Sequence, residues 1–310
     1  MTSKRERAIV VSALKRAAPY IRLFKGKVFV LKAGGEIFAD RATTTALMEQ
    51  VGILHQVGVR VVLIHGGGPQ STELATALGV DTTFVDGRRV TDGASLDVAT
   101  MVLNGQINTR VLAACRDLQI PAVGISGVDA GLIRARRRPP VERDGDSTVD
   151  YGFVGDIDSV DADILQKQLD NGLMPVVSPL SCDESGTLLN INADTVAAAI
   201  AAELGAEKMI LLTGAPGVLE DVSDPQSLIS YIDRAQLDTL KADGKLANGM
   251  LPKAAAIDSA LANGVRRVHV ISYNVPDSLL LEVFTNEGTG TLVVNDIAAL
   301  TPAEQGGPDS

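Results

Sequence analysis

Short apolar runs that lead into glycine recur along the chain. Runs of this length bounded by glycine are typical of strands that are buried on both faces of a sheet. The three clearest are VFVL at 28–31, VVLI at 61–64 and MILL at 209–212. A glycine-rich turn follows each of them, so the pattern predicts three buried strands that end in comparable loops.

Segments of helical character separate these runs. Helices are expected at 41–57, at about 70–78 and over VAAAIAAELG, which directly follows Thr195. Further strands are expected within IPAVGIS at 120–126, MPVVSPL at 174–180 and GVRRVHVIS at 264–272. Because strand and helix patterns alternate, the sequence predicts an α/β sandwich with a mainly parallel sheet.

The first 25 residues have a helical pattern of their own. Apolar side chains recur there at three- and four-residue steps, which predicts a helix over residues 4–25. Pro19 lies inside this segment and is expected to kink or split the helix. The helix either packs on its own domain or forms an added arm that meets another subunit.

A segment at 131–157 departs from this alternation. It contains the basic run RARRR, which spans Arg134 to Arg138, then two prolines and an acidic stretch. We interpret it as a hairpin or flap with an exposed loop. The basic run is expected to be solvated surface, as charge runs often are, with a partner site as the alternative.

Composition restricts the class of protein. The chain has 310 residues, 45% of them hydrophobic and 21% charged, which is ordinary for a soluble globular protein. Its net charge of -10 gives no global positive field to attract nucleic acid, so an anionic substrate would need local positive charge. No apolar run is long enough to span a membrane, and no signal peptide is recognisable. Cys115 and Cys182 form neither a metal cluster nor a disulfide framework, so we predict reduced thiols and a cytoplasmic protein.

The glycine turns predict a ligand with several negative charges. Ligands of open α/β sheets bind at the carboxyl ends of strands, where glycine lets backbone N–H groups approach an anion. The P-loop, the dinucleotide-binding fingerprint and the nucleophile elbow are all missing from the sequence. The three histidines, His55, His65 and His269, are isolated, which disfavours zinc or histidine-based catalysis. A nucleotide held by glycine loops is therefore the favoured ligand.

Several motifs together carry a resemblance to a known family. They are KAGG at 32–35, HGGGP at 65–69, GRRVT at 87–91, NINADT at 190–195, GMLPK at 249–253 and LLLEVFTNEGTGT at 279–291. In this order they resemble acetylglutamate kinases, which are members of the amino acid kinase family. The resemblance extends from about residue 27 to 294.

The resemblance implies a fold and a division of the chain. The implied fold is a three-layer αβα sandwich with an open, mainly parallel eight-stranded sheet. The implied parts are an N-terminal helical arm (1–25), a lobe for acetylglutamate binding and dimerisation (26–185), a lobe for ATP binding (186–297) and a tail (298–310). The α/β alternation also restarts near residue 185.

The implied reaction is phosphorylation of the γ-carboxylate of N-acetyl-L-glutamate by ATP, an early step of arginine biosynthesis. A carboxylate with an ordinary pKa near ~4.3 is already ionised at neutral pH, so no general base is needed. The difficulty is that two anions must meet, so catalysis depends on positioning and charge neutralisation. Magnesium is expected to be carried by the ATP phosphates and water, with no dedicated metal site in the protein.

The resemblance also implies roles for individual residues. Lys32 and Lys253 would lie on either side of the transferred phosphoryl group, and Asp194 would orient both lysines. Asp194 also precedes a predicted helix, so a role at the helix N-terminus is the alternative or companion reading. The implied substrate-binding residues are Gly67, Gly68, Arg89 and Asn190, with Arg88 as the neighbour that could be confused with Arg89. The implied nucleotide-binding residues are Gly35, Gly66, Thr213, Gly214, Gly217 and Lys253.

One position departs from the family pattern. Many acetylglutamate kinases have Asp where this chain has Gly214 in LLTGAPG. We predict altered nucleotide affinity rather than lost catalysis, because the two lysines and Asp194 remain.

Regulation and assembly are further implications of the resemblance. Arginine-inhibited members carry an extra N-terminal helix that links dimers into a hexamer. Residues 4–25 resemble that helix, so we expect a homo-oligomer, either a dimer or a trimer of dimers, and inhibition by L-arginine. The corresponding effector residues are Tyr20, His269, Glu282 and Gly288.

Two other functions stay open at this point. One is a kinase of aminoadipate or glutamate attached to a carrier protein, for which the basic run is the only supporting feature. The other is an arginine-sensing regulatory subunit with impaired kinase activity, which Gly214 motivates.

Overall fold

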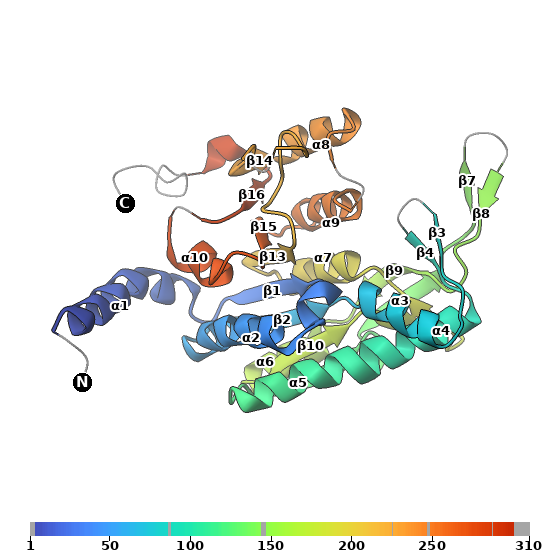
Figure 1. The fold of residues 1–310 in the computed structure, drawn as a ribbon, viewed down its shortest axis with the longest axis horizontal. Helices are drawn as coiled ribbons and strands as arrows, with labels where there is room; N and C mark the ends of the chain where they lie inside the picture. The colour runs from blue at the N-terminus through green and yellow to red at the C-terminus, as the bar shows by residue number, and fades with distance from the viewer. Residues whose placement is uncertain are drawn as a thin grey trace.

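An eight-stranded sheet forms the centre of the described part of the chain, in the order β14-β16-β15-β13-β1-β2-β10-β5 (Figure 1). The structure is a computed structural model that describes residues 4–85, 88–143, 147–224, 226–246, 249–286 and 288–300. The strands of this sheet are β1 (Val28–Ala33), β2 (Arg60–His65), β5 (Ala122–Ser126), β10 (Met174–Ser178), β13 (Lys208–Thr213), β14 (Tyr231–Asp233), β15 (Val268–Ser272) and β16 (Thr291–Val294).

Six of these described strands run parallel to one another. β15 and β16 pair antiparallel, and β14 pairs parallel to β16, so only this end of the sheet is reversed. β1 lies in the middle and pairs parallel with both β2 and β13. The carboxyl ends of β1, β2, β13 and β15 therefore meet at one edge of the sheet. The predicted open, mainly parallel, eight-stranded sheet is confirmed.

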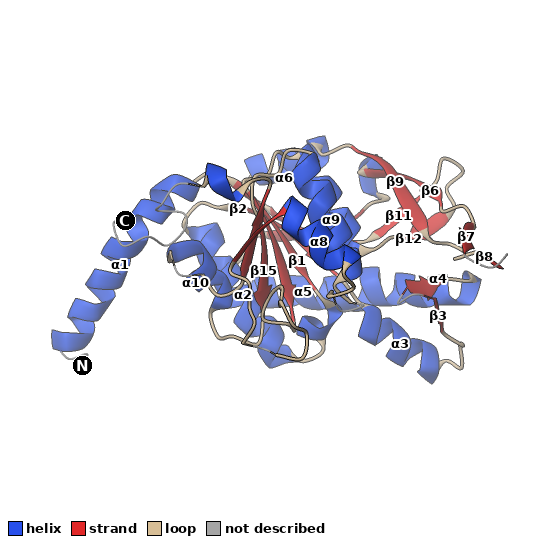
Figure 2. Ribbon diagram, turned by 90° about the horizontal axis from the view of Figure 1, so that it is seen from above, coloured by secondary structure: helices blue, strands red, loops and turns tan. Residues whose placement is uncertain are grey.

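Helices cover both faces of the sheet (Figure 2). Successive strand residues point to opposite faces, so Phe29 and Leu31 join one buried cluster while Val28 and Val30 join the other. The first cluster lies under α2 (Arg41–Gln56), α5 (Asn108–Asp117) and α10 (Ser278–Phe284). The second lies under α6 (Asp163–Asp170), α7 (Ala193–Glu203), α8 (Arg234–Ala242) and α9 (Leu251–Ala262). These are the three layers that the resemblance implied.

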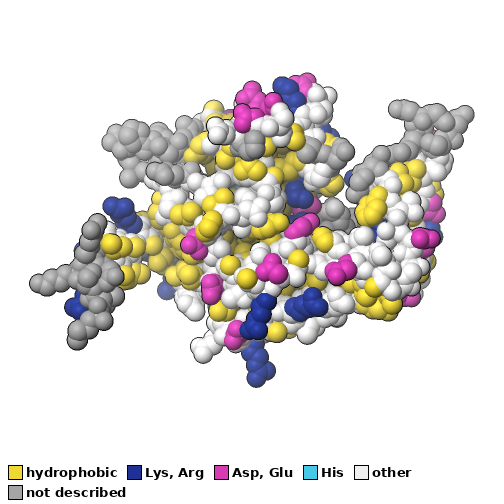
Figure 3. Space-filling view, in the orientation of Figure 1, with side chains coloured by type: hydrophobic (Ala, Val, Ile, Leu, Met, Phe, Trp, Pro, Cys, Tyr) yellow, Lys and Arg dark blue, Asp and Glu magenta, His cyan; other side chains and the backbone are white. Residues whose placement is uncertain are grey.

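The helix α1 (Lys4–Phe24) extends away from this sandwich (Figures 1 and 2). It runs through Pro19 as one helix, so the expected splitting of the helix at this proline is wrong. Its C-terminal part is anchored, where Tyr20 donates to the side chain of Asn286 and the Phe24 ring packs edge-on against Phe29 with 5.2 Å between centroids. The rest leaves apolar side chains in solvent, visible as yellow atoms on the arm in Figure 3. These include Ile9, Val10, Val11 and Leu14.

A smaller layer of strands lies beside the sandwich. Its four-stranded sheet has the order β12-β11-β6-β9, and two separate hairpins are formed by β3 with β4 and by β7 with β8. The strands are β3 (Thr83–Val85), β4 (Arg88–Val90), β6 (Ile133–Arg137), β7 (Val141–Arg143), β8 (Ser147–Val149), β9 (Gly155–Val160), β11 (Leu180–Cys182) and β12 (Leu188–Asn190). The predicted hairpin at 131–157 is thus present.

The basic run lies mostly in β6 and not in a loop, while its Arg134, Arg136 and Arg137 are solvent-exposed, as expected. Three of its arginines pair with acidic groups of the same chain. Arg136 pairs with Asp158, Arg137 with Asp150 at 2.9 Å and Arg138 with Asp156 at 2.6 Å. The charge of the run is therefore largely neutralised where it lies.

Shorter elements join these layers. They are α3 (Gly68–Ala77), α4 (Gly93–Thr100), a π-helix η2 (Met101–Ile107) and three 3-10 turns, η1 (Gly35–Phe38), η3 (Asp129–Gly131) and η4 (Ile297–Ala299). Residues 1–3 of the predicted arm, Gly87 of the GRRVT motif and residues 301–310 of the predicted tail lie outside the described residues. Among the described helices, none is both long and apolar enough to cross a membrane. Cys115 and Cys182 are both free thiols, and burial raises the pKa of Cys115 to about 12.

Candidate active site

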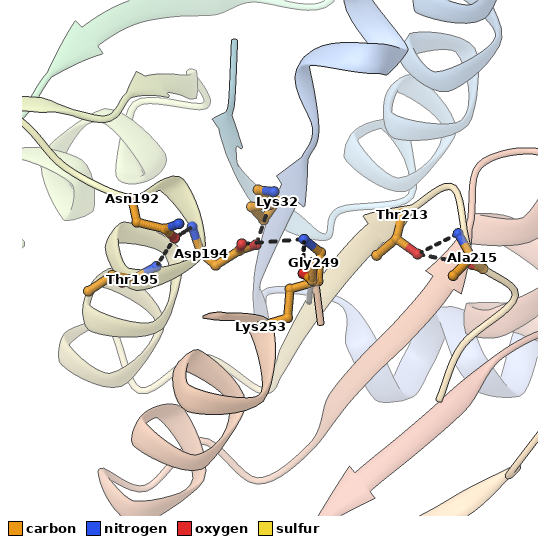
Figure 4. Close-up of polar contacts among 8 residues, drawn as sticks. All are labelled: Lys32, Asn192, Asp194, Thr195, Thr213, Ala215, Gly249 and Lys253. Atoms are coloured by element: carbon orange, nitrogen blue, oxygen red, sulfur yellow. Dashed lines mark hydrogen bonds and ion pairs between the residues drawn. The ribbon is translucent and has the colours of Figure 1, made fainter. Parts of the chain in front are cut away.

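Two lysines and one aspartate meet at the carboxyl edge of the central sheet (Figure 4). Lys32 Nζ lies 3.0 Å from Asp194 Oδ1, and Lys253 Nζ lies 3.5 Å from Asp194 Oδ2. The side chains of Lys32 and Asp194 are 8% and 5% exposed, while that of Lys253 is 19% exposed. One buried carboxylate therefore holds two ammonium groups, one of which remains partly open to solvent.

Asp194 reaches this position because a neighbour caps its helix. Asn192 is the N-cap of α7, and its side-chain oxygen accepts hydrogen bonds from the backbone N–H groups of Asp194 and Thr195. Asp194 lies in the first turn, where its carboxylate is free to contact the lysines. The helix-terminal and lysine-orienting interpretations of Asp194 are thus compatible, although the cap itself is Asn192.

Charge decides the protonation state of this cluster. Burial raises the pKa of Asp194, but the two lysines outweigh it and hold that pKa below its usual range. Burial lowers the pKa of Lys253, and Lys32 adds to this effect while Asp194 opposes it. Lys253 lies in the first turn of α9, and its ammonium also contacts the Gly249 carbonyl at 3.4 Å.

Two glycine loops lie side by side next to Lys32. The Gly66 N–H donates to the Ala33 carbonyl at 2.8 Å, which joins the loop after β2 to the end of β1. A Cβ on Gly35 would come within 2.9 Å of the Gly67 Cα, so these backbones approach too closely for any other residue. Gln70 ties them further, because its amide nitrogen donates to the Gly35 carbonyl at 2.6 Å. Gly68 begins α3, and a Cβ there would meet open space.

Arg89, rather than Arg88, faces these loops. Its guanidinium donates to the Thr72 hydroxyl at 2.6 Å and to the Gly68 carbonyl at 3.3 Å, and it stacks on Phe84. Arg88 is exposed on the same hairpin. The structure therefore distinguishes the two arginines that the sequence left ambiguous.

Asn190 is the last residue of β12 and lies close to Thr91, which directly follows the hairpin of β3 and β4. Its amide nitrogen lies 3.4 Å from the hydroxyl of Thr91, the last residue of the GRRVT motif. Thr91 is fully buried, and the backbone at Tyr151 and Phe153 bonds to it on both sides. Motifs that lie far apart in the sequence are thus brought into one wall of the site.

The predicted nucleotide loop follows β13. The Thr213 hydroxyl closes the turn by contacting both the carbonyl and the N–H of Ala215 (Figure 4). The Gly214 carbonyl accepts from the side chain of Asn274 at 3.0 Å, and a Cβ on Gly214 would lie 3.5 Å from the Tyr273 hydroxyl. Gly217 is closely packed, since a Cβ there would come within 2.6 Å of both Leu228 and Thr291.

The predicted effector residues line one cavity of about 260 Å³ between α1, α10 and the reversed end of the sheet. All four predicted residues, Tyr20, His269, Glu282 and Gly288, belong to its wall. His269 Nδ1 lies 2.6 Å from Glu282 Oε1, and its Nε2 lies 3.1 Å from Lys208 Nζ. Burial lowers the pKa of His269 to about 4, so the imidazole is neutral and carries its proton on Nδ1.

Glu282 is the negative group of this cavity. Burial raises its pKa, but hydrogen bonds from His269 and the Thr289 N–H outweigh that effect and hold the pKa at about 2. A Cβ on Gly288, which has a φ of +61°, would lie 3.1 Å from Glu282 Oε2. Tyr20 of α1 donates to the side chain of Asn286, which connects the arm to the same wall.

Sequence reasoning missed several polar residues of these sites. Gln70, Thr91, Asn192 and Asn108 all hold neighbouring loops or helix ends. Asn192 could have been found as a capping residue before an apolar helix. The other three act through contacts far apart in the sequence, which leave no local signal. Within the described residues, no group of three or more His, Cys, Asp or Glu side chains is placed to hold a metal ion.

Comparisons with known proteins agree with this geometry. The model of the amino acid kinase family matches residues 27–272. Acetylglutamate kinase of Myxococcus xanthus is 47% identical over 292 residues, which cover 93% of this chain and 95% of that protein. Acetylglutamate kinase of Symbiobacterium thermophilum is 45% identical over 283 residues, or 91% of this chain and 97% of that protein.

A solved structure also shares the fold. N-acetylglutamate synthase of Neisseria gonorrhoeae, complexed with coenzyme A and N-acetyl-glutamate, superposes with a TM-score of 0.80 at 30% identity over 92% of this chain. Its complex with coenzyme A and L-arginine gives the same TM-score at 29% identity. The present chain spans only 63% of the length of the synthase in the first complex.

The family match and these relatives show that the chain belongs to the amino acid kinase family. Such enzymes are phosphotransferases, and the chain uses ATP. Within the family it groups with the acetylglutamate kinases, which match it over more than nine-tenths of its length.

Proposed function

We propose that this chain transfers the γ-phosphoryl group of ATP to the γ-carboxylate of N-acetyl-L-glutamate. The observation that carries the proposal is the cluster of Lys32, Asp194 and Lys253 at the edge where the glycine loops meet. A pair of ammonium groups held by one carboxylate can neutralise charge on either side of a transferred phosphoryl group. Asp194 fixes both lysines before substrate arrives, which avoids the cost of ordering them during the reaction.

The neighbouring groups fit the two reactants. Arg89 offers a planar guanidinium for a substrate carboxylate, and Asn190 offers an amide on the same wall. The backbone of Gly35, Gly67 and Gly68 would face the phosphates and substrate oxygens, with the loop after β13 on the nucleotide side. Gly66, which the sequence placed with the nucleotide-binding residues, instead donates its N–H to the Ala33 carbonyl and supports the loop from within. Magnesium would enter bound to the ATP phosphates and would offset their negative charge.

The test is ADP release from ATP and magnesium in the presence of N-acetyl-L-glutamate, with hydroxylamine to trap an acyl phosphate. Wild type is expected to turn over only when acetylglutamate is present. Lys32→Ala should lose at least roughly a hundredfold in kcat, because one of the two neutralising charges is gone. Turnover without acetylglutamate, or an active Lys32→Ala enzyme, would contradict the proposal. No turnover in wild type with arginine still bound would instead indicate a sensor subunit.

We also propose that L-arginine binds the cavity lined by Tyr20, His269, Glu282 and Gly288 and inhibits the enzyme. The cavity presents an ionised carboxylate that suits a guanidinium, and part of its wall comes from α1. A titration of the wild-type rate with L-arginine tests this directly, with L-lysine as the control for charge alone. Unchanged activity at saturating arginine would exclude the inhibitory role.

A further inference from the structure

A buried histidine lies directly beneath the glycine loop that follows β2. His65 is completely buried, its Nδ1 lies 3.2 Å from the Gly66 carbonyl oxygen, and its Nε2 lies 3.2 Å from Asn108 Nδ2. The reaction proposed above uses neither His65 nor Asn108. Their contacts nevertheless join the loop to the helix layer below it.

The contacts of Asn108 determine which nitrogen of His65 carries the proton. Asn108 Nδ2 also lies 2.9 Å from the Val176 carbonyl, which can only accept a hydrogen bond, so this atom of the side chain is the amide nitrogen. An amide nitrogen can only donate, so His65 Nε2 must be the acceptor. The single proton of the neutral imidazole then lies on Nδ1 and is donated to the Gly66 carbonyl.

Holding this carbonyl also orients the next N–H group. The peptide between Gly66 and Gly67 is planar and trans, so its N–H points away from its carbonyl oxygen. With the Gly66 oxygen directed at the buried imidazole, the Gly67 N–H is directed away from it. His65 thereby aims one of the backbone donors that the proposed function assigns to substrate.

The π-helix η2 completes this support. Asn108 follows directly after η2, and a Cβ on Gly67 would come within 2.7 Å of both Leu103 and Ile107 of η2. A Cβ on Gly124 would come within 2.0 Å of Asn108 Oδ1, so glycine is needed there to admit the asparagine. Single π-helical turns inside helices are frequent at functional sites. Here the π-helix brings two apolar side chains and one amide under the glycine loop.

The surroundings of the imidazole keep it neutral. It is faced by the Phe38 ring edge, the Gly66 carbonyl and the Asn108 amide, none of which ionises. Burial lowers the pKa of His65 to about 4, and the Gly66 carbonyl opposes this only partly. The imidazole therefore keeps one proton over the physiological range.

We propose that His65 and Asn108 are positioning residues: Asn108 fixes the tautomer of His65, and His65 holds the Gly66–Gly67 peptide so that its N–H faces the reactants. This inference rests on the proposed kinase function.

The test replaces the amide of Asn108 by a carboxylate, in Asn108→Asp. The carboxylate accepts where the amide donated, so Nε2 must now carry the proton and the neutral imidazole has none for Gly66. The Val176 carbonyl also loses its donor, but that loss does not depend on the protonation of His65, so the test is the pH dependence and not the loss alone. Near pH 8 the kcat/KM of the variant should be at least roughly tenfold below that of wild type, as expected for a lost buried hydrogen bond. The new charge also raises the pKa of His65, so lowering the pH toward 6 protonates both nitrogens and the ratio of variant to wild-type kcat/KM should recover.

The matched control is Asn104→Asp, the same change one turn earlier in η2. Asn104 contacts Ser178 through its oxygen, which the carboxylate retains, and it does not touch His65. Its activity ratio should not change with pH. A ratio for Asn108→Asp that is flat between pH 6 and 8 would overturn the proposal, whereas an inactive wild type would instead refute the kinase function.

A second measurement does not depend on activity or on the stability of a variant. With only three histidines in the chain, ¹⁵N spectra of histidine-labelled wild type can be assigned with a His65→Gln sample. His65 should show a protonated Nδ1 and an unprotonated Nε2 from pH 8 to 6. A protonated Nε2 in that range would contradict the proposed tautomer and, with it, the positioning role.

Discussion

At the scale of single residues, Asp194 is the group on which the proposed chemistry most depends. Asp194→Asn keeps the shape of the side chain but removes the charge that holds two lysines together. The ammonium groups would then repel each other, so kcat should fall by roughly two to three orders of magnitude. Steady-state kinetics should show this loss, with Asp163→Asn on an exposed helix position as the control. A kcat within tenfold of wild type would show that Asp194 does not position the lysines.

Gly214 gives a second prediction at this scale. A Cβ there has room at 3.5 Å from the Tyr273 hydroxyl, whereas a whole carboxylate must displace that phenol or bond to it. Gly214→Ala should therefore leave the KM for ATP within about twofold, and Gly214→Asp should change it by more than about threefold. The KM for acetylglutamate should not change in either variant. An equal KM for ATP in wild type, Gly214→Ala and Gly214→Asp would show that position 214 does not affect nucleotide affinity.

A candidate site residue could be predicted from the sequence where it lies at the end of a recognisable buried strand. Lys32 is recognisable because it follows a buried apolar run and precedes two glycines. Arg89 could not be separated from Arg88, because their difference lies in which one turns toward Thr72. Asn108 could not be predicted at all, because its partners His65 and Val176 are its neighbours only in the folded chain.

At the scale of elements, the reversed strand β16 connects the two proposed ligand sites. It begins directly after Gly290 of the cavity wall, and its Thr291 hydroxyl accepts from the Val218 N–H of the nucleotide loop at 2.8 Å. Thr291→Val keeps the volume and removes this acceptor, which leaves a buried N–H unpaired. Arginine binding measured by calorimetry should persist while the maximal inhibition falls. Full inhibition by arginine in this variant would exclude this connection.

The elements themselves were largely predictable. The strands of the parallel region follow from apolar runs, and α2 and α7 follow from their periodicity and composition. The reversed direction of β14 and β16 could not be predicted from their own residues, because it depends on how the chain returns to the sheet edge formed by β15. The π-helix η2 was equally unpredictable, because one extra residue in a turn leaves the surrounding helical pattern intact.

At the scale of the whole molecule, the exposed apolar face of α1 predicts assembly. Ile9, Val10, Val11 and Leu14 are all more than half exposed, which is costly unless a second copy covers them. We expect light scattering to find an oligomer larger than a dimer. Leu14→Glu should reduce its mass, whereas Ser12→Glu, on the opposite side of the helix, should not. A mass that neither substitution changes would exclude α1 as the contact.

The stability of the molecule should depend on pH through its buried histidines. The pKa values of His65 and His269 are about 4 in the folded protein, below the ordinary 6.5. The unfolded chain therefore binds protons first, so stability is full above pH 6.5 and is lost as the pH falls toward 4. Lys208, Arg267 and Glu282 face His269, whereas uncharged groups surround His65.

Urea unfolding at pH 7.5 and pH 5.0 measures this effect. The free energy of unfolding should fall by on the order of 2 kcal/mol per histidine between these conditions. His269→Gln should show a smaller loss than wild type over the same range. Equal stability of wild type at both pH values would show that neither histidine is held neutral.

The central position of β1 has a consequence for dividing the molecule. Its two neighbours come from opposite halves of the chain, β2 before the Asp183–Gly186 turn and β13 after it. Fragments separated at that turn would each expose a long, apolar, unpaired strand edge, and such edges are templates for aggregation. Produced together, the same two edges complement each other residue by residue from Phe29 to Ala33. The turn is therefore a natural place to split the enzyme into fragments whose reassociation restores the lysine pair, and with it a measurable signal.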